Sequence, residues 1–317
     1  MTLRHNKENP IVSVLLSAFN GDAFIQEQIV SIVKQNFNRF NIILRDDGSK
    51  NTNYGFIKNI SNKYNISILV DDKNDENIGS VKSYNRLLGQ SQSDYICFSD
   101  QDDVWKKDKL FHSFKRMKDL EKEHGSHTPI LVHTDLSVCD NHLQKVHPSF
   151  ITYQKLDPSK KSLHYLLLQN NVTGCTMMIN RALKEKSFPI PEDACVHDWW
   201  IALVASSFGI IDFISIPTVK YRQHDKNQIG ARKYGIHHFI NRLKNIDSLI
   251  DEFHASILQA TALYQRYKNS LNDEQKKIIL AFINLEKKNI IERKITILRY
   301  KFFKQDFFRT IGLIGLV

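Results

Sequence analysis

The stretch Asp94–Trp105, DYICFSDQDDVW, places an apolar run directly before a cluster of carboxylates. Residues 94–99 have the length and composition of a strand that is buried on both faces. Mg²⁺ and Mn²⁺ bind hard oxygen ligands, and carboxylates two positions apart in an extended turn can face the same side. The cluster Asp100–Asp103 is therefore a candidate metal site, although an acidic surface turn would have the same sequence.

Three earlier apolar runs predict further strands, at Ile11–Ser17, Asn41–Leu44 and Ile66–Val70. Helical patterns separate them, which predicts right-handed crossovers and a mostly parallel sheet. Ligands of such sheets bind beyond the carboxyl ends of the strands. Polar loops follow three of the four strands, at Asn20, at Asp46–Asp47 and at Asp100–Asp103. We expect these loops to form one site.

The second half predicts strands at 130–134, 175–179 and 210–216, the last closed by Pro217, and a helix at 197–208. From Tyr234 onward two long helical patterns run to about Tyr267 and from Asp273 to about Phe308. The fold class is therefore α/β with a C-terminal helical extension. We place the boundary so that residues 1–230 form the α/β domain and residues 231–317 form a basic helical region.

The positive charge is concentrated in that extension. The chain has a net charge of +10, and residues 231–317 hold 16 Lys and Arg against 8 Asp and Glu, which accounts for +8. Such a region favours an anionic partner, either nucleic acid or an acidic membrane. Bulky apolar residues alternate with the basic ones in Lys287–Val317, and no RNA-binding motif accompanies them. We therefore predict an anionic membrane surface as partner and no nucleic acid. In the alternative, the apolar face packs on the α/β domain.

Cysteine usage and the amino terminus bear on the compartment. Cys97, Cys139, Cys175 and Cys195 show no metal-ligand spacing, and three lie in apolar runs, so buried free thiols are expected. Residues 1–10 are polar and do not resemble a signal peptide. No stretch approaches the roughly 20 apolar residues of a membrane span. We expect a cytoplasmic protein that is soluble or peripheral.

Two loops carry features suited to a flat base. A carboxylate at Asp46 or Asp47 can accept the N–H of a pyrimidine ring, and Phe19 could offer the face of its ring to the base. An ordinary Asp-Gly turn and a core aromatic are the alternatives.

Two later motifs add titratable groups. In His197-Asp198-Trp199-Trp200 a carboxylate lies beside an apolar wall, which raises its pKa and suits a general base, although Asp198 could instead cap a helix. In Tyr221-Arg222-Gln223-His224, Arg222 could neutralise phosphate and His224 could complete a metal shell. A lone histidine in a loop is more often only solvated.

Together these residues resemble the family 2 glycosyltransferases, which are inverting enzymes with the GT-A fold, a Rossmann-like and mostly parallel α/β sheet. The matching blocks span Ser13–Gly230: SVLLSAFNGDAFIQEQIVSIVKQ, RDDGS, NIGSVKSYNRLL, DYICFSDQDDVW, GCTMMINR, HDWW and YRQHDKNQIG. The DQDDVW form, with HDWW and YRQH, most resembles rhamnosyltransferases of bacterial cell-wall, capsule and O-antigen polysaccharide assembly.

The resemblance implies roles for particular residues, with Asp198 as the catalytic base and Asp100 on the ribose. The donor nucleotide would lie against Ser17, Phe19, Asn20, Asp46, Asp47, Asp100 and Arg222. Mn²⁺ or Mg²⁺ would be held by Asp102, Asp103 and His224. The acceptor and sugar pocket would include Gly174, Cys175, His197, Trp199 and Trp200. The chain lacks the QxxRW motif of processive members, which argues against a polymerising synthase.

The implied activity is transfer of L-rhamnose from dTDP-rhamnose to a lipid-linked saccharide, by an enzyme peripheral to the inner face of the plasma membrane. A UDP-hexose or UDP-N-acetylhexosamine transferase of the same fold is the first alternative. An inactive basic membrane-binding protein is the second, and the three carboxylates Asp102, Asp103 and Asp198 argue against it. Dehydrogenases and P-loop enzymes are disfavoured, because neither glycine-rich motif occurs.

Overall fold

The first half of the chain forms four parallel strands with helices on both faces. The computed structural model describes residues 10–21, 24–49, 55–71, 77–224, 246–306 and 309–310. The strands are β1 (Val12–Ala18), β2 (Phe40–Asp46), β3 (Ile68–Asp71) and β4 (Tyr95–Ser99), and the helices between them are α1 (Ile25–Val33), α2 (Gly55–Tyr64) and α3 (Ser80–Gln90). All four predicted strands and the helices between them are confirmed, in the order β3-β2-β1-β4.

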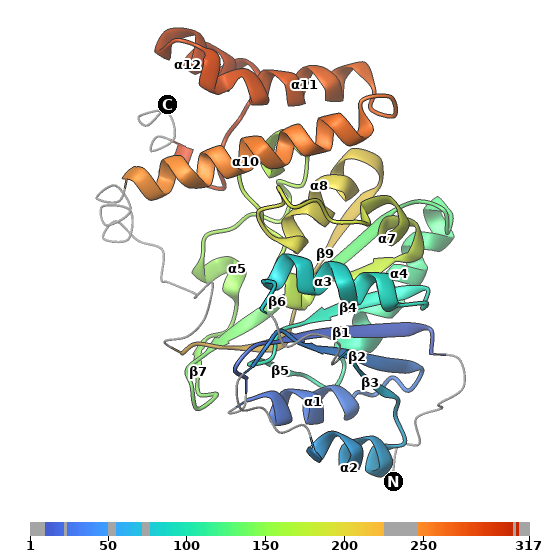
Figure 1. The fold of residues 1–317 in the computed structure, drawn as a ribbon. Helices are drawn as coiled ribbons and strands as arrows, with labels where there is room; N and C mark the ends of the chain where they lie inside the picture. The colour runs from blue at the N-terminus through green and yellow to red at the C-terminus, as the bar shows by residue number, and fades with distance from the viewer. Residues whose placement is uncertain are drawn as a thin grey trace.

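Alternation along the strands divides the core between the two faces of this sheet. Val14 and Leu16 of β1 belong to one buried cluster, with residues of α1 and α2, whereas Leu15 belongs to a second cluster with residues of α3. Successive side chains of a strand point to opposite faces, so an unbroken apolar run is what a doubly covered strand requires. In Figure 1, α1 and α2 accordingly lie on the opposite side of the sheet from α3.

The second half extends this sheet with mixed pairings. Its elements are β5 (Val104–Trp105), α4 (Lys109–His124), β6 (Ile130–Cys139), β7 (Lys145–His147), α5 (Phe150–Tyr153), α6 (Leu163–Leu166), η1 (Gly174–Thr176), β8 (Met178–Asn180), α7 (Arg181–Ser187), α8 (His197–Phe208) and β9 (Ile210–Arg222). The described residues form one nine-stranded sheet in which β8 joins β4 to β6 by antiparallel pairs. The predicted mostly parallel sheet therefore holds for β1–β4 and for the parallel pair β6–β9, whereas the short strands β5 and β7 were not predicted.

Three predicted strand limits in this half are wrong. The strand predicted at 130–134 continues to Cys139 as β6. The predicted strand at 175–179 begins as the 3₁₀ turn η1, and only β8 pairs. Pro217 does not close the strand that begins at Ile210, because β9 continues to Arg222. Proline lacks an N–H group and is tolerated in a sheet at irregularities. Pro217 lies opposite Asp135, where the β6–β9 register shifts on both sides.

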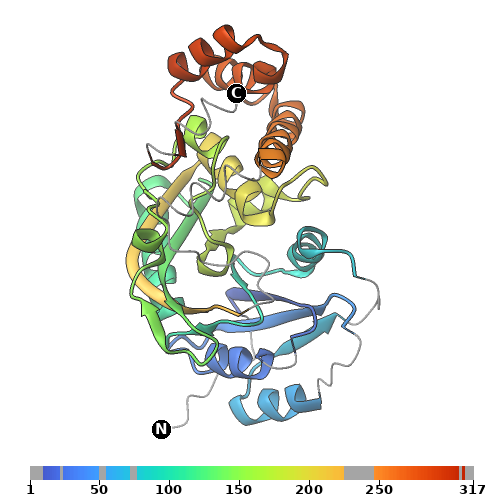
Figure 2. The same cartoon turned by 90° about the vertical axis from the view of Figure 1, so that its left-hand side faces the viewer.

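The C-terminal helices pack on the α/β core. They are α10 (Ile246–Tyr267), α11 (Asp273–Ile283), η2 (Asn284–Lys287) and α12 (Ile290–Arg299), so the second predicted long helix is interrupted. Figures 1 and 2 show them stacked at the end of the molecule that carries α8. Leu263 and Phe282 share one buried cluster with Trp200 of α8. Tyr267 donates a hydrogen bond to the carbonyl of Lys186.

Several expectations concern residues that the structure does not describe. The domain boundary at residue 230 lies outside the described residues, as do Phe307, Phe308 and residues 311–317 of the predicted membrane-facing tail. No described helix combines the length and the apolar character that crossing a membrane requires.

The junction between α8 and β9 depends on close contact at Gly209. Gly209 donates its N–H to the carbonyl of Ala205, and Ile210 donates to the carbonyl of Pro129 at 2.9 Å. A Cβ at position 209 would lie 1.9 Å from that Pro129 oxygen. This contact joins the end of α8 to the start of β6, so it sets where α8 lies on the sheet.

We predict that Gly209→Ala lowers the free energy of unfolding by about 1–3 kcal/mol, because backbone must move to admit the methyl group. Gly89→Ala is the matched control. Its Cβ would lie 3.3 Å from the edge of the Phe188 ring, which is 38% exposed and can shift. Because alanine favours the helix interior, this control should remain within about 1 kcal/mol of the wild type. Urea denaturation measures both, and equal stabilities of the two variants would contradict the prediction.

Candidate active site

The three predicted polar loops meet at one edge of the sheet. Strand β1 pairs with β2 on one side and with β4 on the other, with Ala18 opposite Asp46 and Leu16 opposite Ser99. The three strands are parallel, so their carboxyl ends lie side by side. The loops that contain Asn20, Asp46–Asp47 and Asp100–Asp103 therefore lie together, as expected, and their membership of one functional site stays a prediction.

The Gln101 side chain ties the first loop to the third. Its Oε1 accepts the N–H of Phe19 at 2.7 Å, and its Nε2 donates to the carbonyl of Phe19 at 2.9 Å. Gly21 leaves room for this contact, since a Cβ there would lie 2.2 Å from Gln101 Oε1. Sequence reasoning gave Gln101 no role, because its partner is backbone and therefore leaves no side-chain signal at Phe19.

A second tie joins the first loop to the second. Asn20 has a φ of 50°, and its N–H donates to Ser49 Oγ at 2.7 Å. Ser49 Oγ in turn donates to Asp46 Oδ1 at 2.5 Å. The ring of Phe19 is 42% exposed, which suits a stacking platform and disfavours the core-aromatic alternative. Ser17 lies in the same region, partly exposed near the end of β1.

The adjacent carboxylates of Asp46 and Asp47 face different surroundings. Asp47 is buried, and its oxygens accept hydrogen bonds from the N–H groups of Ile78 (3.0 Å) and Gly79 (2.9 Å). Asp47 also forms an ion pair at 3.2 Å with the buried Arg45. It therefore holds the start of α3 against β2. Asp46 is partly exposed, and its Oδ1 accepts hydrogen bonds from both the N–H and the hydroxyl of Ser49. Of the two predicted base ligands, Asp46 is the one turned toward solvent.

Three aspartates crowd the loop after β4. Burial, followed by the negative charge of Asp102, raises the pKa of Asp100 to about 6, and Tyr84 donates a hydrogen bond to its Oδ1 at 3.0 Å. Asp103 is fully buried, and burial with the charges of Asp102 and Asp100 raises its pKa well above the usual range. Its Oδ1 accepts the N–H of Arg222 at 3.3 Å, whereas Oδ2 has no partner among the described residues.

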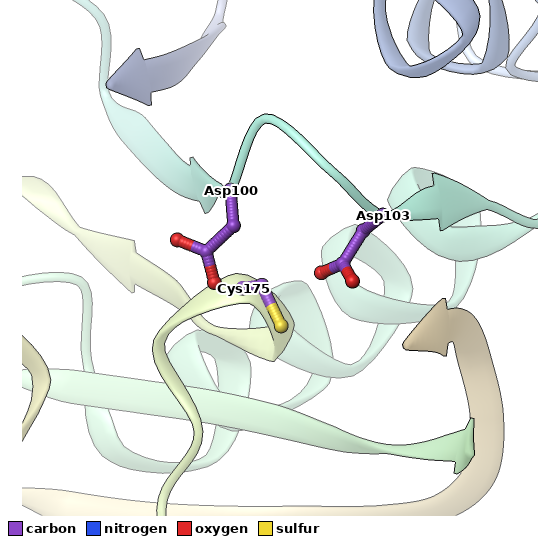
Figure 3. A group of neighbouring side chains, drawn as sticks. All are labelled: Asp100, Asp103 and Cys175. Carbon is purple, nitrogen blue, oxygen red and sulfur yellow. The ribbon is translucent and has the colours of Figure 1, made fainter. Parts of the chain in front are cut away.

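These features fit a divalent cation. In Figure 3, Asp100 and Asp103 both point toward Cys175 of η1, and one ligand atom from each lies within 4.8 Å of the others. Burial and the two carboxylates raise the pKa of the Cys175 thiol, which therefore stays protonated and binds metal poorly. The remaining ligands are carboxylate oxygens, as Mg²⁺ and Mn²⁺ prefer. A cation would also relieve the repulsion between the carboxylates and satisfy Asp103 Oδ2.

The predicted metal set overlaps this group only at Asp103. Asp102 Oδ2 instead pairs with Nε2 of His224 at 2.9 Å, and the imidazole stacks on Phe24 at 5.0 Å between ring centroids. His224 is thus not merely a solvated loop histidine. Its location beside the acidic loop agrees with the prediction, and metal ligation by Asp102 and His224 stays a prediction.

Arg222 is bound into the protein. Its guanidinium donates to the carbonyl of Asp102 at 2.9 Å and to that of Asn141 at 2.6 Å, and it pairs with Glu27 at 2.5 Å. The guanidinium lies 4.4 Å from the centroid of the Phe24 ring. Arg222 was predicted to contact the donor phosphate. In the structure its guanidinium instead fixes the acidic loop and counters the charge of that loop.

Asp198 lies in the first turn of α8, where its carboxylate accepts hydrogen bonds from two neutral donors. Its Oδ1 accepts from Asn170 Nδ2 at 3.1 Å, and its Oδ2 accepts the N–H of Gly174 at 2.8 Å. The residue that caps α8 is Val196, so the helix-cap alternative for Asp198 is wrong. Burial, opposed by the Gly174 N–H and assisted by the charge of Asp100, raises the pKa of Asp198 to about 7. Asn170 was missed, because nothing near it in sequence marks the carboxylate it binds.

The residues around Asp198 divide between site and core. His197 stacks on Tyr84 at 3.8 Å, and burial lowers its pKa to about 3, so it is neutral and a poor base. Gly174 must lack a side chain, since a Cβ would lie 2.9 Å from His197 Nε2. Trp199 is partly exposed and donates to the carbonyl of Leu166. Trp200 is fully buried, so its predicted place in a sugar pocket is wrong.

The reason for this correction lies in α8 itself. From residue 200 to residue 205 every side chain is buried, and the Trp200 ring packs between α7 and α10, where Nε1 donates to the carbonyl of Ser187. Arg266 of α10 covers the ring at 5.0 Å. The thiols behave as predicted: Cys97, Cys139 and Cys175 are buried and free, and Cys195 is free and partly buried.

Comparison with known proteins assigns the family. The model of glycosyl transferase family 2 matches residues 13–185, more than half of the chain, so the chain belongs to this family. A curated relative, the dTDP-rhamnosyl transferase RfbG of Shigella flexneri, is 27% identical over 68% of this chain and 74% of its own length.

Solved structures support the fold. TarS of S. aureus superposes with a TM-score of 0.56 at 18% identity, over 86% of this chain but only 43% of the TarS chain. The mannosyltransferase PcManGT from Pyrobaculum calidifontis, solved with GDP-Man and Mn²⁺, gives a TM-score of 0.51 at 15% identity over 98% of this chain and 86% of its own. At these identities the likeness shows the fold alone, and the predicted GT-A fold is confirmed.

We predict that the Asp198 carboxyl titrates with a midpoint near 7, well above the usual aspartate value of 3.8. Carbon-13 NMR of aspartate-labelled protein measures this, with the Asp198→Asn variant identifying the resonance. Asn170→Ala removes a donor that stabilises the charged form, so it should raise the midpoint further. A midpoint near 4 in the wild type would contradict the inferred dry environment.

Proposed function

We propose that the chain transfers L-rhamnose from dTDP-rhamnose to a lipid-linked saccharide in bacterial polysaccharide synthesis, with inversion at the anomeric carbon. The proposal of glycosyl transfer rests on one observation. A family 2 protein here contains both a carboxylate with a raised pKa, Asp198, and the acidic loop Asp100–Asp103. Rhamnose as the donor sugar is supported by the DQDDVW motif and by the similarity to RfbG.

The donor nucleotide is proposed to lie over the first two loops. The exposed ring of Phe19 would stack on the base, and the partly exposed carboxylate of Asp46 would accept its ring N–H. Ser17 and Asn20 would line the same pocket, and Asp100 would accept a ribose hydroxyl. Asp47 and Arg222 would contribute indirectly, because both hold loops that touch the donor.

Mn²⁺ or Mg²⁺ is proposed as the cofactor. Asp103 would hold it together with Asp100 or Asp102, and His224 would stay beside Asp102. When bound, the ion would stabilise the charge that develops on the departing nucleoside diphosphate. Arg222 assists by keeping the carboxylates of this loop at fixed positions despite their repulsion.

Asp198 is proposed as the general base of a single displacement. Its carboxylate takes the proton of the acceptor hydroxyl as that oxygen bonds to the anomeric carbon. The bond from this carbon to the diphosphate oxygen breaks with its electron pair, and the configuration inverts. A pKa near 7 matches the base to neutral pH, and the N–H of Gly174 and the amide of Asn170 hold it in position.

The acceptor is proposed to enter beside Gly174, His197 and Trp199, which surround the base. A lipid-linked saccharide would present its hydroxyl there while its lipid stays in an anionic membrane. Thymine and uracil both offer a ring N–H that the Asp46 carboxylate can accept. A UDP-hexose or UDP-N-acetylhexosamine transferase is therefore the second candidate.

A donor panel tests the proposal. With Mn²⁺ or Mg²⁺ present, dTDP-rhamnose should release nucleoside diphosphate at least about tenfold faster than UDP-hexoses or UDP-N-acetylhexosamines. Excess chelator should lower the rate by at least about 10²-fold, through loss of a charge-stabilising group. Clear preference for a UDP-sugar would reject rhamnose, and full activity in chelator would reject the metal.

Asp198→Asn is predicted to lower turnover by roughly 10²–10⁴-fold, because a nearly isosteric amide cannot accept the proton. Donor affinity, measured by calorimetry, should change little, since Asp198 contacts the acceptor. Asp193→Asn is the matched control, because this nearby carboxylate is exposed, and it should retain normal turnover. Near-normal turnover of Asp198→Asn would move the base elsewhere.

A further inference from the structure

Helix α12 leaves one apolar face uncovered. Ile291, Ile295 and Leu298 recur at helical spacing and are 72%, 59% and 59% exposed, and the neighbouring Ile290 is 63% exposed. Ile297, on the opposite side of the helix, is fully buried in the core. One face of α12 therefore packs on the core, as one of the two sequence-based alternatives expected, and the membrane-facing prediction concerns the exposed face.

Basic residues surround this face. Residues 287–301 contain six Lys and Arg and a single acid, Glu292. Arg293 serves the fold, since it donates to the carbonyls of Leu285 and Lys288. The other five are exposed or partly exposed, and they are Lys287, Lys288, Lys294, Arg299 and Lys301. A contiguous apolar stripe bordered by exposed cations is unusual on a protein surface, where exposed apolar residues are normally scattered.

The rest of the described chain supports α12 without covering this face. Phe302, three residues beyond the end of the helix, is buried in the cluster that includes Leu285 and Ile297. The chain then returns to the α/β domain, where Gln305 Oε1 accepts the N–H of Asp157 at 2.9 Å and Arg309 donates to the carbonyl of Gln154 at 2.8 Å. Figures 1 and 2 both show α12 at the end of the molecule farthest from α2.

We propose that this outer face of α12, formed by Ile290, Ile291, Ile295 and Leu298, lies in the interface of an anionic lipid bilayer. Its bulky apolar residues enter the acyl boundary while the flanking Lys and Arg side chains pair with lipid headgroups. The charge of the border selects this occupant over a second copy of the chain, whose equally basic α12 would be repelled. The inference deepens the proposed function by placing the enzyme at the membrane that holds its acceptor.

Vesicle sedimentation of the full chain, without donor or acceptor, tests this surface separately from glycosyl transfer. The wild type should bind vesicles of phosphatidylglycerol and phosphatidylcholine at low salt and should bind pure phosphatidylcholine weakly. The combined variant Ile291→Ser, Ile295→Ser, Leu298→Ser should lose at least about tenfold in binding. Lys294→Gln with Arg299→Gln should lose about fivefold for each residue, and only on anionic vesicles.

The control variant combines Leu69→Ser, Phe111→Ser and Val146→Ser, which are 53%, 49% and 55% exposed on β3, α4 and β7. It removes a similar apolar area elsewhere and should bind like the wild type, while circular dichroism verifies that all variants are folded. Unchanged binding of the α12 variant, or an equal loss in the control, overturns the proposal. So does sedimentation velocity showing that the wild type self-associates and the α12 variant does not.

Discussion

The elements around the acidic loop are arranged so that they offset the mutual repulsion of Asp100, Asp102 and Asp103. Three carboxylates occupy one short loop, and each has a different partner: the Tyr84 hydroxyl, the His224 imidazole and the N–H of Arg222. Bringing these partners together requires β4, α3 and the end of β9 to meet at one place. The length of β9, which carries the chain past Pro217 to Arg222, follows from this requirement.

Buried cations behind the acidic loop also offset its negative charge. Lys109 is fully buried, and its Nζ lies 4.5 Å from the centroid of the Trp105 ring. Burial lowers the pKa of Lys109, whereas the negative charge of Asp103 is among the causes that raise it. Arg45 has the same function at the next loop, where it is paired with Asp47 and with Asp71. These cations offset part of the negative charge of the site from the protein side, which leaves the outer side for ligands.

The sequence allowed the parallel strands and their polar ends to be predicted, because strand composition and chain order are local properties. It did not separate Asp46 from Asp47, since neighbouring positions with the same side chain differ only in the direction that the backbone gives them. Gln101 and Asn170 were missed for a related reason, because each binds a group that is far away in the sequence. Gln101 binds the backbone of Phe19, and Asn170 binds the carboxylate of Asp198, 28 positions later. Trp200 was wrongly assigned to the sugar pocket. The sequence around a catalytic base is the same whether a neighbouring aromatic side chain faces the ligand or the core.

The double hydrogen bond between Gln101 and Phe19 has a consequence for anyone who wants to redesign this protein. The first loop, with its aromatic ring, and the acidic loop are fastened to each other, and Ser49 fastens the first loop to the second. A nucleotide preference transplanted from a relative therefore cannot be moved as a single loop. A redesign would have to replace all three loops together, including Gln101 and Gly21, or leave all of them unchanged.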